Sequence, residues 1–137
     1  MARHILVASN RSSLGELVKS ALQSLEYNVE LARDVSLALY LAHKNLPDII
    51  LADHQMMGGS GLDFLRELKA DEELHVIPIL FVSDTEYSAA AAKELQDLGV
   101  ARVLNEVPSL DQLFLELMPY LSLNNHESRT RPPSSPE

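Results

Sequence analysis

Polar side chains stand directly after several apolar runs of this chain, and Asp53 is the most conspicuous of them. It ends the run Ile49–Ala52, and similar positions are held by Ser9-Asn10-Arg11, Ser83-Asp84 and Asn105-Glu106. Carboxylate and amide oxygens are the ligands that a hard divalent cation takes from proteins. If the runs are parallel strands, their carboxyl ends share one edge of a sheet, where open α/β sheets bind ligands. Asp53 is therefore the candidate functional carboxylate, with an ordinary loop acid as the alternative.

The sequence shows no motif for nucleotide binding, for a serine nucleophile or for cysteine chemistry. The segment 58–61 is rich in glycine but lacks the G-x-G-x-x-G pattern and the Lys of a phosphate-binding loop. No serine lies in the pattern of a hydrolase nucleophile elbow. The chain has 0 Cys, which excludes disulfides and thiolate chemistry. We therefore expect no catalytic residues and no enzyme, and a small flavodoxin-like enzyme or nucleotide binder is the least favoured alternative.

Five apolar runs alternate with five segments of helical periodicity between residues 1 and 121. The expected strands are 4–8, 27–31, 49–52, 76–82 and 100–104. The expected helices start with the capping residues Ser13, Asp34, Ser60, Ser83 and Ser109, and Pro119 is expected to kink or end the last one. Strands that are apolar on both faces, each followed by a helix, predict a parallel sheet covered on both sides. The expected fold is a doubly wound (βα)5 flavodoxin-like α/β domain with strand order 2-1-3-4-5.

Composition narrows the class of partner. The chain has 137 residues, with 20 Asp and Glu against 11 Lys and Arg, a net charge of -9. This balance argues against nucleic-acid binding and permits a cation or a basic partner surface. No apolar stretch is long enough to span a membrane. Residues 122–137 are polar and rich in Pro and Ser, so we expect a disordered tail, or a linker to another domain, after a folded domain at 1–121.

The order of these units resembles the receiver domain of bacterial two-component response regulators, over about residues 3–121. Asp53 matches the phospho-accepting Asp at the end of strand 3, and Gly61-Leu62 matches the pair that opens helix 3. The run 77–83 is similar to the family's strand 4, which ends in the Ser or Thr that hydrogen-bonds the phosphoryl group, here Ser83. Leu98-Gly99-Val100 resembles the turn before strand 5.

The departures from that resemblance concern the metal. The family places an acidic pair after strand 1, which holds Mg²⁺ together with the phospho-acceptor, whereas this chain has Ser9 and Asn10 there and no acid before Glu16. Mg²⁺ requires a near-octahedral set of oxygen ligands. Asn10, Asp53 and the backbone carbonyl of Gln55 could still supply some of them, and Asp84 is a possible substitute acid, although a solvated loop role is favoured for it. We therefore expect Mg²⁺ binding to be weak. No other cofactor is expected.

The phosphate side of the site departs as well. The family's Lys after strand 5 is matched by Glu106, or by Val107 with a shift of one residue, and neither is a cation. Glu106, Ser83 and Asp84 are the expected neighbours of the phosphate site. At the switch position the aromatic residue of strand 5 is replaced by Val103, which leaves Ser83, itself a possible helix cap. The resemblance therefore indicates a degenerate receiver, or pseudo-receiver.

The resemblance implies a signalling role in the cytoplasm. We expect a protein-interaction module of a two-component or phosphorelay system, with weak or no phosphorylation at Asp53. Its partner would be a histidine kinase or a downstream effector, or a second copy bound through the helix 4–strand 5–helix 5 face. The alternative is a working receiver that accepts a phosphoryl group from a histidine kinase at Asp53.

Overall fold

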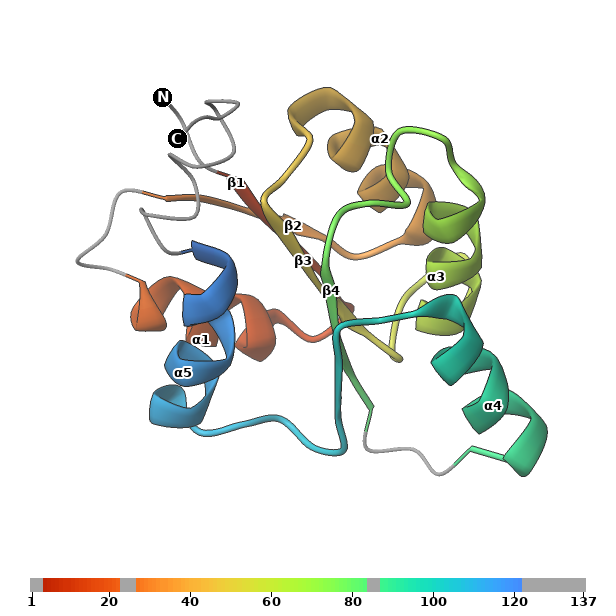
Figure 1. Cartoon of the computed structure of the whole chain (residues 1–137). Helices are drawn as coiled ribbons and strands as arrows, with labels where there is room; N and C mark the ends of the chain where they lie inside the picture. The colour runs from red at the N-terminus through yellow and green to blue at the C-terminus, as the bar shows by residue number, and fades with distance from the viewer. Residues whose placement is uncertain (1–3, 23–26, 84–86, 122–137) are drawn as a thin grey trace, which may run out of the picture.

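A five-stranded parallel sheet lies between two layers of helices in the computed structural model of the chain, which describes residues 4–22, 27–83 and 87–121 (Figure 1). The strand order is β2-β1-β3-β4-β5, which confirms the expected fold. The strands are β1 (His4–Ala8), β2 (Asn28–Ala32), β3 (Ile49–Asp53), β4 (Ile79–Val82) and β5 (Arg102–Leu104).

The helices divide between the two faces of the sheet. One face carries α1 (Ser12–Ala21) and α5 (Leu110–Leu121), and the other carries α2 (Val35–Asn45), α3 (Gly61–Ala70) and α4 (Ala89–Leu98), as Figure 1 shows. In β3, Ile49 and Leu51 pack into the first layer while Ile50 and Ala52 pack into the second. Because successive side chains of a strand point to opposite faces, a strand covered on both sides needs apolar residues throughout. This requirement explains the unbroken apolar run that precedes Asp53.

Several helix boundaries follow the expected capping chemistry. The Asp34 side chain accepts a hydrogen bond from the backbone N–H of Leu37 at the start of α2. Ser60 and Asp63 form the reciprocal capping box of α3. At the end of α4, Gly99 takes the left-handed conformation with φ 73°, which glycine adopts at little cost.

Two predicted caps are wrong. The helix α1 begins at Ser12 with Arg11 in the N-cap position, so Ser13 lies inside the helix and caps nothing. The helix α4 is capped by Ser88 instead of Ser83. Ser83 still belongs to the sheet, where its backbone N–H donates to the Leu104 carbonyl at 2.9 Å, and this bond holds it away from the helix.

The predicted strands near 76 and 100 are too long. The Asp71 side chain accepts hydrogen bonds from the N–H groups of Glu73 and Leu74, which turns the chain and delays β4 until Ile79. Val76 is consequently 71% exposed, and β5 begins only at Arg102. Pro119 does not end the last helix, which continues to Leu121, because the burial of Leu117 and Leu121 keeps the final turn packed on the core.

Some expectations fall outside the described residues, namely the role of Asp84 and the tail at 122–137. Within the described ranges no helix has the length and apolar character needed to cross a bilayer.

Candidate functional site

Asp53 lies at the carboxyl end of β3, beside the carboxyl end of β1. Its side chain is fully buried, and Ser9, the residue after β1, is only 6% exposed. The backbone at Asp53 is held closely by α3, because a Cβ atom added at Gly61 would lie 2.1 Å from the Asp53 carbonyl oxygen. Gly61 also donates its N–H to the His54 carbonyl at 2.9 Å. The first turn of α3 therefore fixes the position of the carboxylate and admits no side chain at residue 61.

Arg11 forms a two-pronged ion pair with Asp53. Its Nε atom donates to Oδ2 at 2.7 Å and its Nη2 atom donates to Oδ1 at 2.8 Å. The Arg11 side chain is 22% exposed, so it lies between the buried carboxylate and the solvent. Ser9 adds a third contact, since its hydroxyl donates to Oδ2 at 2.6 Å. Hydrogen bonds between ionised partners in this paired geometry are among the strongest that side chains make.

A backbone contact joins the loop after β1 to the loop after β3. The N–H of Gln55 donates to Oδ1 of Asp53 at 3.2 Å. The carbonyl of the same residue accepts from the N–H of Asn10 at 2.7 Å. The two loops are thus tied together at the carboxylate, and the carbonyl that could have served a metal is bonded to a neighbouring residue.

The donor set around Asp53 does not suit Mg²⁺. Both carboxylate oxygens already accept two hydrogen bonds each, from Ser9 Oγ and Arg11 Nε at Oδ2 and from Arg11 Nη2 and Gln55 N at Oδ1. A guanidinium group would also face any approaching cation. Among the described residues, no three His, Asp or Glu side chains gather in a way that could hold a metal ion. Neutral Asn10 is the only other expected side-chain ligand, and one amide oxygen is a poor substitute for two carboxylates.

Ser83 lies in a second cluster with Tyr87, which reaches back to the residue after Asp53. The Tyr87 hydroxyl lies 2.5 Å from Nδ1 of His54, and the two rings meet edge to face with centroids 5.3 Å apart. On its other side the Tyr87 ring stacks on Phe81, at 6.4 Å between centroids. Burial raises the pKa of Tyr87 above 10.0, and the charge of Asp53 raises it further, against a hydrogen bond with Ser83 that lowers it. The raised pKa favours the protonated form of the Tyr87 hydroxyl, which lies within hydrogen-bonding distance of His54.

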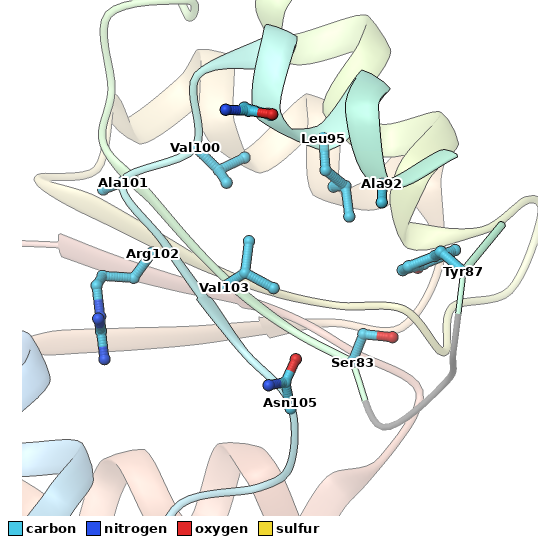
Figure 2. A pocket seen from close by; sticks show the side chains of 10 residues that line it. Ser83, Tyr87, Ala92, Leu95, Val100, Ala101, Arg102, Val103 and Asn105 are labelled. Carbon is cyan, nitrogen blue, oxygen red and sulfur yellow. The ribbon is translucent and has the colours of Figure 1, made fainter. Parts of the chain in front are cut away.

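A groove of about 950 Å³ opens between α4 and β5, beside this cluster (Figure 2). Val103 points from β5 toward Leu95 and Val100, while Ser83 and Tyr87 lie at the other end of the groove (Figure 2). Val103 is 40% exposed. The two predicted switch positions, Ser83 and Val103, thus line one groove.

The predicted phosphate-site neighbour Glu106 does not contact the Asp53 carboxylate. Glu106 is exposed in the turn after β5 and is not among the groups that bond to Asp53. No role was predicted for Arg11 or Tyr87, although the Arg11 side chain bonds to Asp53 and the Tyr87 side chain contacts His54. A possible signal for Arg11 was its position, one residue after Ser9-Asn10, where a cation follows the place from which two acids are missing. Nothing in the sequence pattern distinguishes Tyr87 from other residues of the loop before α4.

Comparison with known proteins gives consistent results. The family described as the response regulator receiver domain matches residues 5–116. Chemotaxis protein CheY of Pseudomonas aeruginosa is 34% identical over 80 residues, which cover 58% of this chain and 64% of that protein. Chemotaxis protein CheY-3 of Vibrio cholerae is also 34% identical over 80 residues, covering 58% of this chain and 62% of that protein. The chain thus spans less than two thirds of the length of these curated relatives.

Solved structures extend the similarity over more of the chain. The chemotaxis response regulator CheY4 of Vibrio cholerae aligns with a TM-score of 0.75 and 26% identity, over 88% of this chain and 100% of that one. The non-phosphorylated HemR receiver domain from Leptospira biflexa aligns with a TM-score of 0.72 and 26% identity, over 88% of this chain and 95% of that one. The family match covers most of the chain, and the strand order and the buried Asp at the end of β3 agree with it. The chain belongs to the response regulator receiver domain family of two-component signalling.

Proposed function

We propose that this chain is a degenerate receiver, which acts in two-component signalling as a protein-interaction module with weak or no phosphorylation at Asp53. The observation that carries the proposal is the state of the carboxylate. Asp53 is fully buried, and each of its oxygens accepts two hydrogen bonds from neighbouring residues. A phospho-acceptor must instead offer an oxygen to phosphorus and neutralise the transferred group, and here neither an acidic pair nor a Lys supports that step.

Intact-mass spectrometry after incubation with phosphoramidate and Mg²⁺ tests the proposal. We expect no gain of about 80 Da, the mass of one phosphoryl group. A receiver that retains the acidic pair and the Lys serves as the positive control for the donor. A gain in the wild-type chain that is lost in Asp53→Asn would instead establish the alternative, a working receiver that a histidine kinase phosphorylates at Asp53.

The surface formed by α4, β5 and α5 is the proposed binding face. Both β5 and α5 carry exposed apolar side chains, with Val103 40%, Leu110 43% and Leu115 69% exposed. Apolar surface left open in this way favours a protein contact. The partner we propose is a signalling protein, either a histidine kinase or a downstream effector, or a second copy of this chain in a homodimer.

Sedimentation equilibrium tests the homodimer. If two copies meet through this face, Val103→Asp will shift the wild-type dimer toward the monomer. The matched control is Tyr40→Asp, since Tyr40 is 59% exposed on α2 and lies toward the opposite edge of the sheet. A monomeric wild-type chain would exclude the homodimer and leave a kinase or an effector as the proposed partner.

A further inference from the structure

The Asp53 carboxylate has no lone pair left to offer. An ionised carboxylate has about four acceptor positions, two on each oxygen. Ser9 Oγ and Arg11 Nε occupy those of Oδ2, and Arg11 Nη2 and Gln55 N occupy those of Oδ1. Any reaction at either oxygen must first break one of these bonds.

Arg11 is the donor that can leave. The N–H of Gln55 is fixed by the backbone, whose carbonyl is bonded to Asn10, and Ser9 is 6% exposed and tightly enclosed. Arg11 stands at the N-cap of α1 on a long side chain that is 22% exposed. It also supplies one bond to each carboxylate oxygen, so its departure would free a position on both of them.

We propose that Arg11 is an autoinhibitory side chain, which masks Asp53 both from phosphoryl donors and from divalent cations. This inference rests on the proposed function, in which the wild-type carboxylate is not modified. Displacing the guanidinium exposes a carboxylate that is already correctly placed by β3 and α3. The donor would be the zwitterionic form of phosphoramidate, whose nitrogen already carries three protons. A carboxylate oxygen of Asp53 would bond to phosphorus, the P–N bond would break, and its electron pair would leave with the nitrogen as ammonia. The products are an aspartyl phosphate and ammonia.

The test compares the wild-type chain with Arg11→Ala and with the double variant Arg11→Ala/Asn10→Asp. The double variant removes the mask and places a second carboxylate where a hard cation could use it. Arg66→Ala is the matched control, because Arg66 also makes a two-pronged ion pair, with Glu94, but on the exposed surface of α3. Mn²⁺ titration followed by electron paramagnetic resonance measures metal binding independently of phosphorylation, and circular dichroism checks that each variant is folded.

We expect the double variant to bind Mn²⁺ and to gain about 80 Da with phosphoramidate and Mg²⁺. Its modified fraction should exceed that of the wild type and of Arg66→Ala by about tenfold or more, as expected when a barrier of a few hydrogen bonds is removed. Adding Asp53→Asn should abolish the gain. If Arg11→Ala unfolds the chain, Arg11→Lys replaces it. Lys keeps the charge but cannot bond both oxygens as the guanidinium fork does, so a smaller gain is expected.

Two results separate this inference from the proposed function. If the wild-type chain stays unmodified and the folded Arg11 variants do too, the masking role is wrong while the proposed function stands. If the wild-type chain is modified, the proposed function is wrong, and the masking role then depends on the rates. Equal rates in the wild type and the Arg11 variants would overturn it.

Discussion

Arg11 and Asp53 should contribute jointly to the free energy of unfolding, and removing Arg11 should cost more than removing the charge of Asp53. Removing one partner of a buried pair costs about 3–5 kcal/mol, because the other charge is left without compensation in a poorly solvated place. Asp53 is fully buried, whereas the Arg11 side chain is 22% exposed. We therefore expect Arg11→Ala to lower the free energy of unfolding by about 3 kcal/mol. Asp53→Asn should cost only about 1 kcal/mol, since Arg11 can turn toward water and the Asn amide oxygen still accepts a hydrogen bond.

Urea unfolding of the four species of a double-mutant cycle measures these energies. The double variant Arg11→Ala/Asp53→Asn should be more stable than Arg11→Ala alone, because it no longer buries an unpaired charge. The coupling energy expected is about 2 kcal/mol. In thermal unfolding, Arg11→Ala should lower Tm by roughly 9–15 °C, from about 3–5 °C for each kcal/mol in a domain of this size. Additive effects, or a larger loss for Asp53→Asn than for Arg11→Ala, would refute the reasoning.

Three further predictions concern positions outside the ion pair. Gly61→Ala should lower the free energy of unfolding by about 3 kcal/mol or more, because the added Cβ would lie 2.1 Å from a backbone oxygen. Gly15→Ala should cost far less, since its Cβ meets only the flexible side chain of Leu31. The urea unfolding midpoints of the two variants test this difference. Leu46→Gly should stabilise the fold by about 1 kcal/mol, because Leu46 adopts the left-handed conformation with φ 45° at the end of α2 and is 48% exposed. Its Tm should rise, whereas the Tm of Leu46→Ala, which keeps the strained conformation, should not. The pKa of Asp71 lies below 3.8, chiefly through the hydrogen bond from the N–H of Leu74. Its charge therefore stabilises the fold above pH 3.8, and this stabilisation is lost as the pH falls through the lowered pKa. The difference in unfolding free energy between the wild type and Asp71→Asn should shrink on acidification from pH 7 to pH 3, and a constant difference would contradict the prediction.

The fold was accessible from the sequence because its signals are local and repeat along the chain. The run Ile49–Ala52 is apolar on both faces, and the structure buries all of it between two helical layers. The capping box at Ser60 likewise depends only on residues three apart. The predicted start of β4 was wrong, because the apolar character of Val76 and Ile77 is compatible with a turn as well as with a strand. The hydrogen bonds that the Asp71 side chain accepts stabilise the turn, so that the strand begins only at Ile79.

The site was only partly accessible, because the direction of a long side chain is not encoded in a periodic pattern. Asp53 and Ser9 could be placed from the ends of their strands, which lie side by side in the sheet. Arg11 lies two residues beyond β1, where backbone conformation decides whether its guanidinium turns to solvent or toward β3. The sequence showed that no acidic pair follows β1, but it could not show that the Arg11 side chain pairs with the Asp53 carboxylate.

The charges around Asp53 explain why the acidic excess of this chain does not amount to a metal site. In a receiver of the kind this chain resembles, three carboxylates, one Lys and one Mg²⁺ leave a formal charge of zero, from −3, +1 and +2, and the metal supplies most of the compensation. Among the described residues of this site, one carboxylate and one guanidinium, −1 and +1, leave zero without any ion. The net charge of -9 lies elsewhere on the chain and is screened over about 8 Å at physiological salt, so it cannot replace ligands at the site. Restoring an acid by Asn10→Asp alone would give Arg11 a second carboxylate to pair with. The guanidinium would still oppose a cation. Either change alone leaves a formal charge of −1, and only the loss of Arg11 together with the gain of an acid leaves −2 with no guanidinium beside the carboxylates.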